Sequence, residues 1–169
     1  MPSMDTWLAV ASRREVREYG DRPLPQESVR RILDAGRLAG SAKNRQPWRF
    51  LVVEDAGARE QLADAVYEPA NVRGAQLVVA IVGKGGLDTG RCVQNMLLVA
   101  WNEGIGSCPN GLSDPEGARA ALGLAEDDGL AIVLTFGYPA RPRDPHRRTP
   151  EDWSARADRK PLDGLVEKV

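Results

Sequence analysis

Two stretches of the chain repeat apolar residues at the three- and four-residue spacing of an amphipathic helix. The first follows Pro25, which suits the first turn of a helix, and ends near Gly40. The second follows Asp88, which can cap a helix, and its apolar stripe consists of Val93, Leu97, Ala100, Trp101 and Gly104. A shorter helix is predicted to open at Asp114-Pro115-Glu116 and to end at Gly123.

Three further runs are apolar at consecutive positions and rich in β-branched residues. They lie at about residues 50–54, 77–83 and 130–136. Such runs are typical of strands in a sheet that is covered on both faces. Together with the helices they predict an α+β fold. Because no internal repeat or low-complexity linker interrupts the pattern, we expect residues 1–169 to form a single domain.

The last thirty residues have a different composition. From Ala140 the chain is rich in Pro, Arg and Asp, and little periodicity returns until Leu162, Leu165 and Val166. This pattern predicts an extended arm over residues 140–169. Such an arm would be costly to order on a monomer, because few apolar side chains compensate its lost conformational entropy.

Charge and cysteine usage narrow the function classes. The formal net charge of −1 gives no global basic field for nucleic acid, although the 23 Lys and Arg residues crowd into 13–17, 141–148 and 156–160. Local sites for small phosphorylated ligands fit this distribution. Cys92 and Cys108 lack zinc or disulfide spacing, so no metal site is expected, and a reducing cytoplasm is the default compartment. No apolar run reaches the ~20 residues of a membrane span, and no secretion signal is visible.

Two polar clusters carry candidate chemistry. Ser41, Asn44 and Gln46 lie between a helix end and an apolar strand, where they can donate and accept hydrogen bonds to a planar, polar-edged ligand. The segment 12–19 carries arginines that could converge on a phosphate. Helix capping with a turn, and a solvated basic helix end, are the simpler interpretations of the same residues, and Trp48 beside the first cluster fits core packing.

With several further segments in the same order, these clusters resemble the nitroreductase family of FMN flavoproteins. The further segments are the strand 77–83, the helix beginning Asp88-Thr89-Gly90-Arg91, the turn 103–108, the strand ending Phe136-Gly137-Tyr138-Pro139 and the tail Arg159-Lys160-Pro161-Leu162-Asp163. The resemblance covers most of the chain. It implies a nitroreductase-like α+β fold with a central, mostly antiparallel sheet covered by helices.

The family's Arg-Arg-Ser-x-Arg pattern implies a set of phosphate ligands. Carried over to this chain, Arg13 and Arg17 would touch the FMN phosphate, Arg14 would lie nearer the flavin ring or the ribityl chain, and Arg159 would be a fourth cation. This sequence departs from the pattern at Glu15, where a serine is usual. A carboxylate there would repel a phosphate dianion unless its side chain turns away or pairs with an arginine.

The resemblance also implies contacts to the rest of the cofactor. Ser41, Asn44 and Gln46 would serve the flavin ring and the ribityl groups, and Asn110 and Gly111 in the segment 109–112 would present backbone N–H groups to flavin N5. The segment 109–112 could also be a simple turn. No acid, base or nucleophile of the protein is assigned a catalytic role, because the flavin itself carries the hydride.

The implied function is that of an FMN-dependent oxidoreductase with a ping-pong mechanism. NADH or NADPH would be the electron donor, and a nitroaromatic, quinone or enone the electron-poor acceptor. In the family two chains interlock with the flavins at the interface, which implies a homodimer, and the apolar stripe after Asp88 is a candidate interface. No nucleic-acid or membrane partner is expected.

Several alternatives stay open. Within the fold, relatives dehalogenate iodotyrosine, fragment reduced flavin or take part in deazaflavin maturation. Outside catalysis, the chain could be a flavin carrier, or a structural homodimer whose site Glu15 has vacated.

Overall fold

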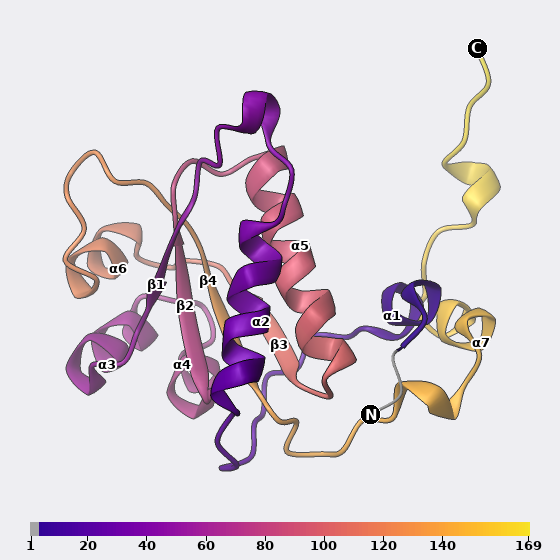
Figure 1. The fold of residues 1–169 in the computed structure, drawn as a ribbon, viewed down its shortest axis with the longest axis horizontal. Helices are drawn as coiled ribbons and strands as arrows, with labels where there is room; N and C mark the ends of the chain where they lie inside the picture. Colours follow the sequence, from indigo (N-terminus) through magenta and orange to yellow (C-terminus); the bar gives the residue numbers. More distant parts are fainter. Residues whose placement is uncertain (1–3) are drawn as a thin grey trace.

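The computed structural model of the chain describes residues 4–169. A four-stranded antiparallel sheet forms its centre, with strand order β1-β2-β4-β3 (Figure 1). The strands are β1 Arg49–Val52, β2 Leu77–Val82, β3 Gly106–Asn110 and β4 Leu130–Gly137. The α-helices are α1 Thr6–Ser12, α2 Gln26–Arg37, α3 Ala56–Asp64, α4 Pro69–Gly74, α5 Leu87–Asn102, α6 Pro115–Ala121 and α7 Pro150–Ala155, and short 3₁₀ turns lie at η1 Ala42–Asn44, η2 Pro145–Arg147 and η3 Leu162–Gly164. The α+β fold with a sheet of this type confirms the prediction.

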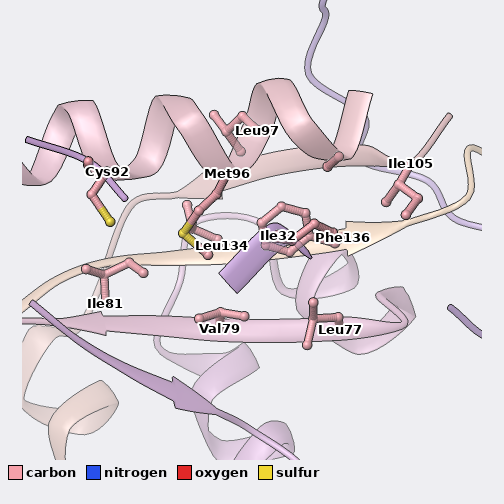
Figure 2. Packing of buried hydrophobic residues seen from close by; sticks show 12 residues of the cluster. Ile32, Leu77, Val79, Ile81, Cys92, Met96, Leu97, Ile105, Leu134 and Phe136 are labelled. Atoms are coloured by element: carbon pink, nitrogen blue, oxygen red, sulfur yellow. The ribbon is translucent and has the colours of Figure 1, made fainter. Parts of the chain in front are cut away.

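The sheet is covered on both faces, as its apolar runs predict. Along β2, Leu77, Val79 and Ile81 face α2 and α5, whereas Val78 and Ala80 face the opposite layer of α3, α4 and α6. The first layer is an apolar core in which Met96 and Phe136 are fully buried (Figure 2). Helices therefore pack against both faces of the sheet. This packing fixes the position of the strands and of the loops at their ends.

The structure moves two predicted helix starts. Pro25 is the residue before α2, not part of its first turn. Asp88 does not cap α5, because the preceding position belongs to Gly86, whose φ of 133° lies in a region that favours glycine. Asp88 lies one residue inside the helix, and its Oδ2 accepts a hydrogen bond from the backbone N–H of Ala42 at 3.0 Å. Asp114, by contrast, caps α6 as predicted.

Most of the apolar stripe of α5 is not exposed, so it does not offer the free surface that the interface prediction assumed. Leu97 and Ala100 are 2% and 0% exposed and lie in the cluster that α5 forms with α2 and the sheet. Trp101 is 3% exposed, and its indole N–H donates to Ser12 Oγ of α1. The face that α5 turns outward instead carries Leu87 and Gln94. Helical periodicity located the apolar face but not what covers it.

One strand is absent from the sequence-based prediction. Residues 103–108 were expected as a turn, yet β3 occupies Gly106–Asn110 and pairs with β4. Glycine and proline are depleted in strands, so Gly106 and Pro109 hid this one from the sequence pattern. Pro109 is tolerated here because β3 is an edge strand. Gly106 is also required for packing: a Cβ there would lie 2.7 Å from Val16.

The arm after Ala140 is only partly extended. It contains α7, which packs against α1, and the last residues then run away from the body (Figure 1). Leu162, Leu165 and Val166 are all exposed. Trp153 explains why a segment with little periodicity folds back here, since its indole N–H donates to the carbonyl of Pro145 at 2.8 Å.

Candidate functional site

The basic segment after α1 is held in an extended conformation beside β3. The backbone N–H of Val16 donates to the carbonyl of Ser107 at 3.0 Å. Arg13 then donates through Nη2 to Oε1 of Glu15 at 2.8 Å. The second terminal nitrogen, Arg13 Nη1, and the second oxygen, Glu15 Oε2, are buried and find no hydrogen-bond partner among residues 4–169. The unusual carboxylate therefore pairs with an arginine and leaves Nη1 of that arginine without a partner.

Three of the four predicted arginines line one cavity. Its volume is about 250 Å³, and its lining includes side chains of α1, α5 and the arm. The lining residues are Trp7, Val10, Ala11, Arg13, Arg14, Gln94, Ser154, Ala157 and Arg159. Arg13 and Arg159 are 146 positions apart, so only the folding of the arm onto α1 brings them together. We call this space the α1–arm cavity.

Arg14 holds the arm against α1. Its Nη1 donates to two carbonyls of its own segment, and its Nη2 donates to the carbonyl of Trp153 at 3.0 Å. The same guanidinium stacks over the Trp153 ring at 5.5 Å, and Arg148 stacks over it at 4.9 Å. Much of Arg14's donor capacity is therefore used within the chain. Nothing in the composition of the arm identified Trp153 as its partner.

The α1–arm cavity is electropositive. Burial lowers the pKa of Arg14, and the positive charges of Arg159, Arg13 and Arg143 lower it further. A guanidinium stays protonated at neutral pH under such shifts. Cations held this close repel one another unless an anion enters, so the cavity favours a negatively charged ligand.

Arg17 lies elsewhere. It lines a separate cavity of about 250 Å³ together with Arg141 and Arg143. Glu15 also lines this second space, while its partner Arg13 lines the first. The Arg13–Glu15 pair thus stands between two basic cavities.

Ser41, Asn44 and Gln46 occupy a strained loop between α2 and β1. Lys43, Asn44 and Gln46 have φ angles of 54°, 53° and 48°, a region that residues other than glycine seldom adopt. Ser41 Oγ accepts from the backbone N–H of Gln46 at 2.8 Å, and Asp88 anchors the loop to α5. Strain of this kind persists at functional sites when the surroundings fix it. Asn44 and Gln46 are exposed. The Gln46 amide nitrogen donates to the carbonyl of Asn44 at 3.3 Å, which leaves the Gln46 amide oxygen and the Asn44 amide available to a ligand.

One chain does not bring this loop to the α1–arm cavity. The loop is tied to α5 at Asp88, whereas α1 is tied to it at Trp101, whose indole N–H donates to Ser12 Oγ at 2.9 Å. These two positions are 13 residues apart, which is about 20 Å along a helix. The two predicted halves of the site therefore lie toward opposite ends of α5 (Figure 1).

Of the two residues predicted to contact flavin N5 at the end of β3, Asn110 is buried and Gly111 is exposed. The Asn110 side chain is 3% exposed; it accepts from Asn71 Nδ2 at 2.7 Å and lies 3.2 Å from Thr135 Oγ1. Only its backbone could therefore serve a ligand. Gly111 is exposed, its carbonyl accepts from the N–H of Tyr67, and a Cβ there would lie 3.2 Å from the Tyr67 ring. Sequence reasoning missed both Asn71 and Tyr67, since neither stands in a recognisable motif.

Other features of the described chain bound the chemistry. No helix within residues 4–169 is long and apolar enough to cross a membrane. Across the same residues, no group of three or more His, Cys, Asp or Glu side chains could hold a metal ion. Cys92 and Cys108 are buried free thiols, and His146 is exposed.

Comparison with known sequences shows that most of this chain is similar to proteins of one family. A sequence profile described as the Nitroreductase family matches residues 10–86 and 85–138. A Methanothermobacter thermautotrophicus protein, named provisionally as an NADH dehydrogenase/NAD(P)H nitroreductase, is 31% identical over 169 residues, covering 89% of this chain and 88% of that protein. The 5,6-dimethylbenzimidazole synthase of Rhodospirillum rubrum is 42% identical over 165 residues, covering 75% of this chain and 78% of that enzyme.

The fold has matches among solved structures. One is a provisionally named nitroreductase of Desulfovibrio desulfuricans, crystallised in complex with FMN. It is 27% identical, with a TM-score of 0.81, and the match covers 99% of this chain and 98% of that one. Similarity therefore extends over the arm as well as the sheet and its helices.

Proposed function

Because this chain belongs to the nitroreductase family, we propose that it is an FMN-dependent oxidoreductase that carries electrons from NADH or NADPH to an electron-poor acceptor. Nitroaromatics, quinones and enones are the acceptor classes, and ping-pong kinetics are expected. The FMN held by the Desulfovibrio desulfuricans relative and the donor in the name of the Methanothermobacter protein support the proposal. A reducing compartment such as the cytoplasm suits its two buried thiols.

The observation that carries the proposal is the unused nitrogen of Arg13. A buried, unpartnered donor costs about 1–3 kcal/mol, so a protein rarely leaves one without a ligand to meet it. Arg13 and Arg159 line the α1–arm cavity, where guanidinium groups match the geometry of a phosphate. The residues present therefore fit the phosphate of FMN. On this proposal Glu15 would not vacate the site, because its carboxylate is paired and only one nitrogen of Arg13 is consumed.

The remaining residues would orient the cofactor. Asn44 and Gln46 carry exposed amides that can pair with the pyrimidine edge of a flavin, and the backbone at Gly111 is open to a close approach. When bound, FMN supplies the hydride chemistry, for which none of these side chains is suited. The protein's part is to hold the phosphate, fix the ring and leave room above it for donor and acceptor.

We further propose that the working form is a homodimer with the flavin at the interface. The loop with Ser41 and Asn44 would complete the α1–arm cavity of the partner, since the two halves are separated within one chain. The outward face of α5 lies between them, and Gln94 on this face lines both the α1–arm cavity and a cavity beside Gly40. Leu87, which is 79% exposed, gives this face an apolar contact surface.

The first experiment is a visible spectrum of the purified protein, loaded with FMN and then desalted. Retained flavin that bleaches anaerobically with NADH or NADPH, and recovers with a quinone, is the expected result. Retained flavin that no nicotinamide bleaches would reject the oxidoreductase and favour a carrier. Failure to retain any flavin would reject the FMN site itself.

A second candidate function follows from the Rhodospirillum rubrum relative. At 42% identity, that enzyme makes 5,6-dimethylbenzimidazole a product worth testing. The loaded protein would be supplied with NADPH and oxygen, and the reaction analysed by liquid chromatography. Accumulation of 5,6-dimethylbenzimidazole with loss of FMN would replace the proposed function, whereas intact FMN after many turnovers supports it.

A further inference from the structure

The second basic cavity has walls made by two backbone-paired segments. The carbonyl of Glu18 accepts from Ala140 N–H at 3.0 Å, and the carbonyl of Tyr138 accepts from Gly20 N–H at 2.9 Å. Tyr19 and Pro139 form an antiparallel bridge between these bonds. The chain around Pro139, where the arm begins, is therefore hydrogen-bonded to the end of the basic segment.

This pairing explains why the arginines meet. If the antiparallel register is continued by two residues, Arg17 comes opposite Arg141. Continued by four, Glu15 comes opposite Arg143. Alternate residues of an extended segment share one side, and Pro142 keeps the residue before it extended. The cavity of about 250 Å³ lined by Glu15, Val16, Arg17, Glu18, Pro139, Arg141 and Arg143 agrees with this arrangement.

The charge of the second cavity is not balanced by the chain. Arg17, Arg141 and Arg143 form no ion pair with any residue from 4 to 169, and one of the two carboxylates, Glu15, is already engaged by Arg13. Like charges set opposite one another are destabilising in a paired structure. An anion with several acceptor oxygens would relieve this repulsion and could take hydrogen bonds from two guanidinium forks.

We propose that this second cavity binds the 2′-phosphate of NADPH and makes NADPH the preferred electron donor. The inference rests on the proposed function, because a nicotinamide donor is meaningful only if FMN turns over. It adds a specificity site that the cofactor contacts do not include. Among residues 4–169, no residue lines both basic cavities, and the Arg13–Glu15 pair connects them, so a phosphate in each would be held by different arginines.

Direct binding tests the site without turnover. Adenosine 2′,5′-bisphosphate should bind the FMN-loaded protein, measured by calorimetry, about tenfold or more tightly than 5′-AMP, which lacks the 2′-phosphate. Arg141→Ala should weaken that binding by about tenfold or more, and Arg141→Lys by less, because the charge is kept while the fork is lost. Arg147→Ala is the matched control, since this exposed arginine of the arm lines neither cavity.

Kinetics and FMN affinity separate the competing outcomes. The ratio of kcat/KM for NADPH over NADH should fall about tenfold or more in Arg141→Ala. Equal binding of the two adenine nucleotides to the parent would overturn the site, even in an enzyme that reduces quinones normally. Weakened FMN binding in Arg141→Ala, with no effect on adenosine 2′,5′-bisphosphate, would assign the cavity to the FMN phosphate instead and also overturn it. Loss of bleaching with both donors, despite tight nucleotide binding, would reject the proposed function while leaving the phosphate site intact.

Discussion

Replacing Arg13 with alanine tests the assignment of the FMN phosphate most directly. Arg13 Nη2 is held by Glu15 at 2.8 Å, and Nη1 is buried without a partner among the described residues. On the proposed function, Nη1 would be the group that meets the phosphate. The substitution would remove this donor from a residue that lines the cavity, while the other lining residues are unchanged.

The expected cost follows from that geometry. A hydrogen bond to a charged group contributes about 1.5–3 kcal/mol, which corresponds to a roughly tenfold to hundredfold increase in the dissociation constant of FMN. Glu15, left without its partner, adds to this cost, because an unpaired carboxylate beside the cavity repels a phosphate dianion. Its side chain is 32% exposed, so water can hydrate part of the freed charge and Arg13→Ala should remain folded.

The assay is titration of apoprotein with FMN, followed by quenching of flavin fluorescence, with a urea denaturation of each variant alongside. Arg147→Ala controls for the general loss of one positive charge, and a second titration in higher salt measures screening. An FMN dissociation constant within about twofold of the parent value would remove Arg13 from the site. An equal loss in Arg147→Ala would show that only the overall field matters. Glu15→Gln added to Arg13→Ala should recover the part of the loss that is due to the unpaired carboxylate, but not the part due to the missing guanidinium.

Three other predictions concern the fold and the assembly. Thr135→Val should lower the free energy of unfolding in urea by about 1–3 kcal/mol, because fully buried Thr135 Oγ1 donates to Asn71 Oδ1 at 3.0 Å; an unchanged value would contradict the importance of this network. Burial raises the pKa of the Cys92 thiol from 9.0 to about 11. The unfolded thiol then loses its proton first, so unfolding free energy should fall as pH rises through this window, and less steeply in Cys92→Ala. Leu87→Glu should convert a dimer to a folded monomer in light scattering and weaken FMN retention; a dimer that persists would place the interface elsewhere.

Some of the local structure could be predicted because it depends on local spacing. The apolar repeat before Gly40 is α2, and the run 77–83 is a strand apolar on both faces, since burial of one stripe or two faces leaves a period in the sequence. Asp114 capping α6 is likewise a short-range signal. The resemblance to the family, whose segments follow the same order, related the two polar clusters to one cofactor. Edge strand β3 left no such signal, because Gly106 and Pro109 are poor strand formers that only the neighbouring β4 makes acceptable.

The sequence by itself determined the helices α2, α5 and α6, the strands β1, β2 and β4, the α+β class and the arginines proposed as phosphate ligands. Only the tertiary structure decided how those arginines are divided. It paired Arg13 with Glu15, joined Arg13 to Arg159 across the arm, and placed Arg17 with Arg141 in another cavity. It also buried the apolar stripe that the sequence offered as an interface. The physical reason is range: periodicity indicates whether a side chain is buried, whereas the residues around it can come from distant parts of the chain, as Arg13 and Arg159, 146 positions apart, show.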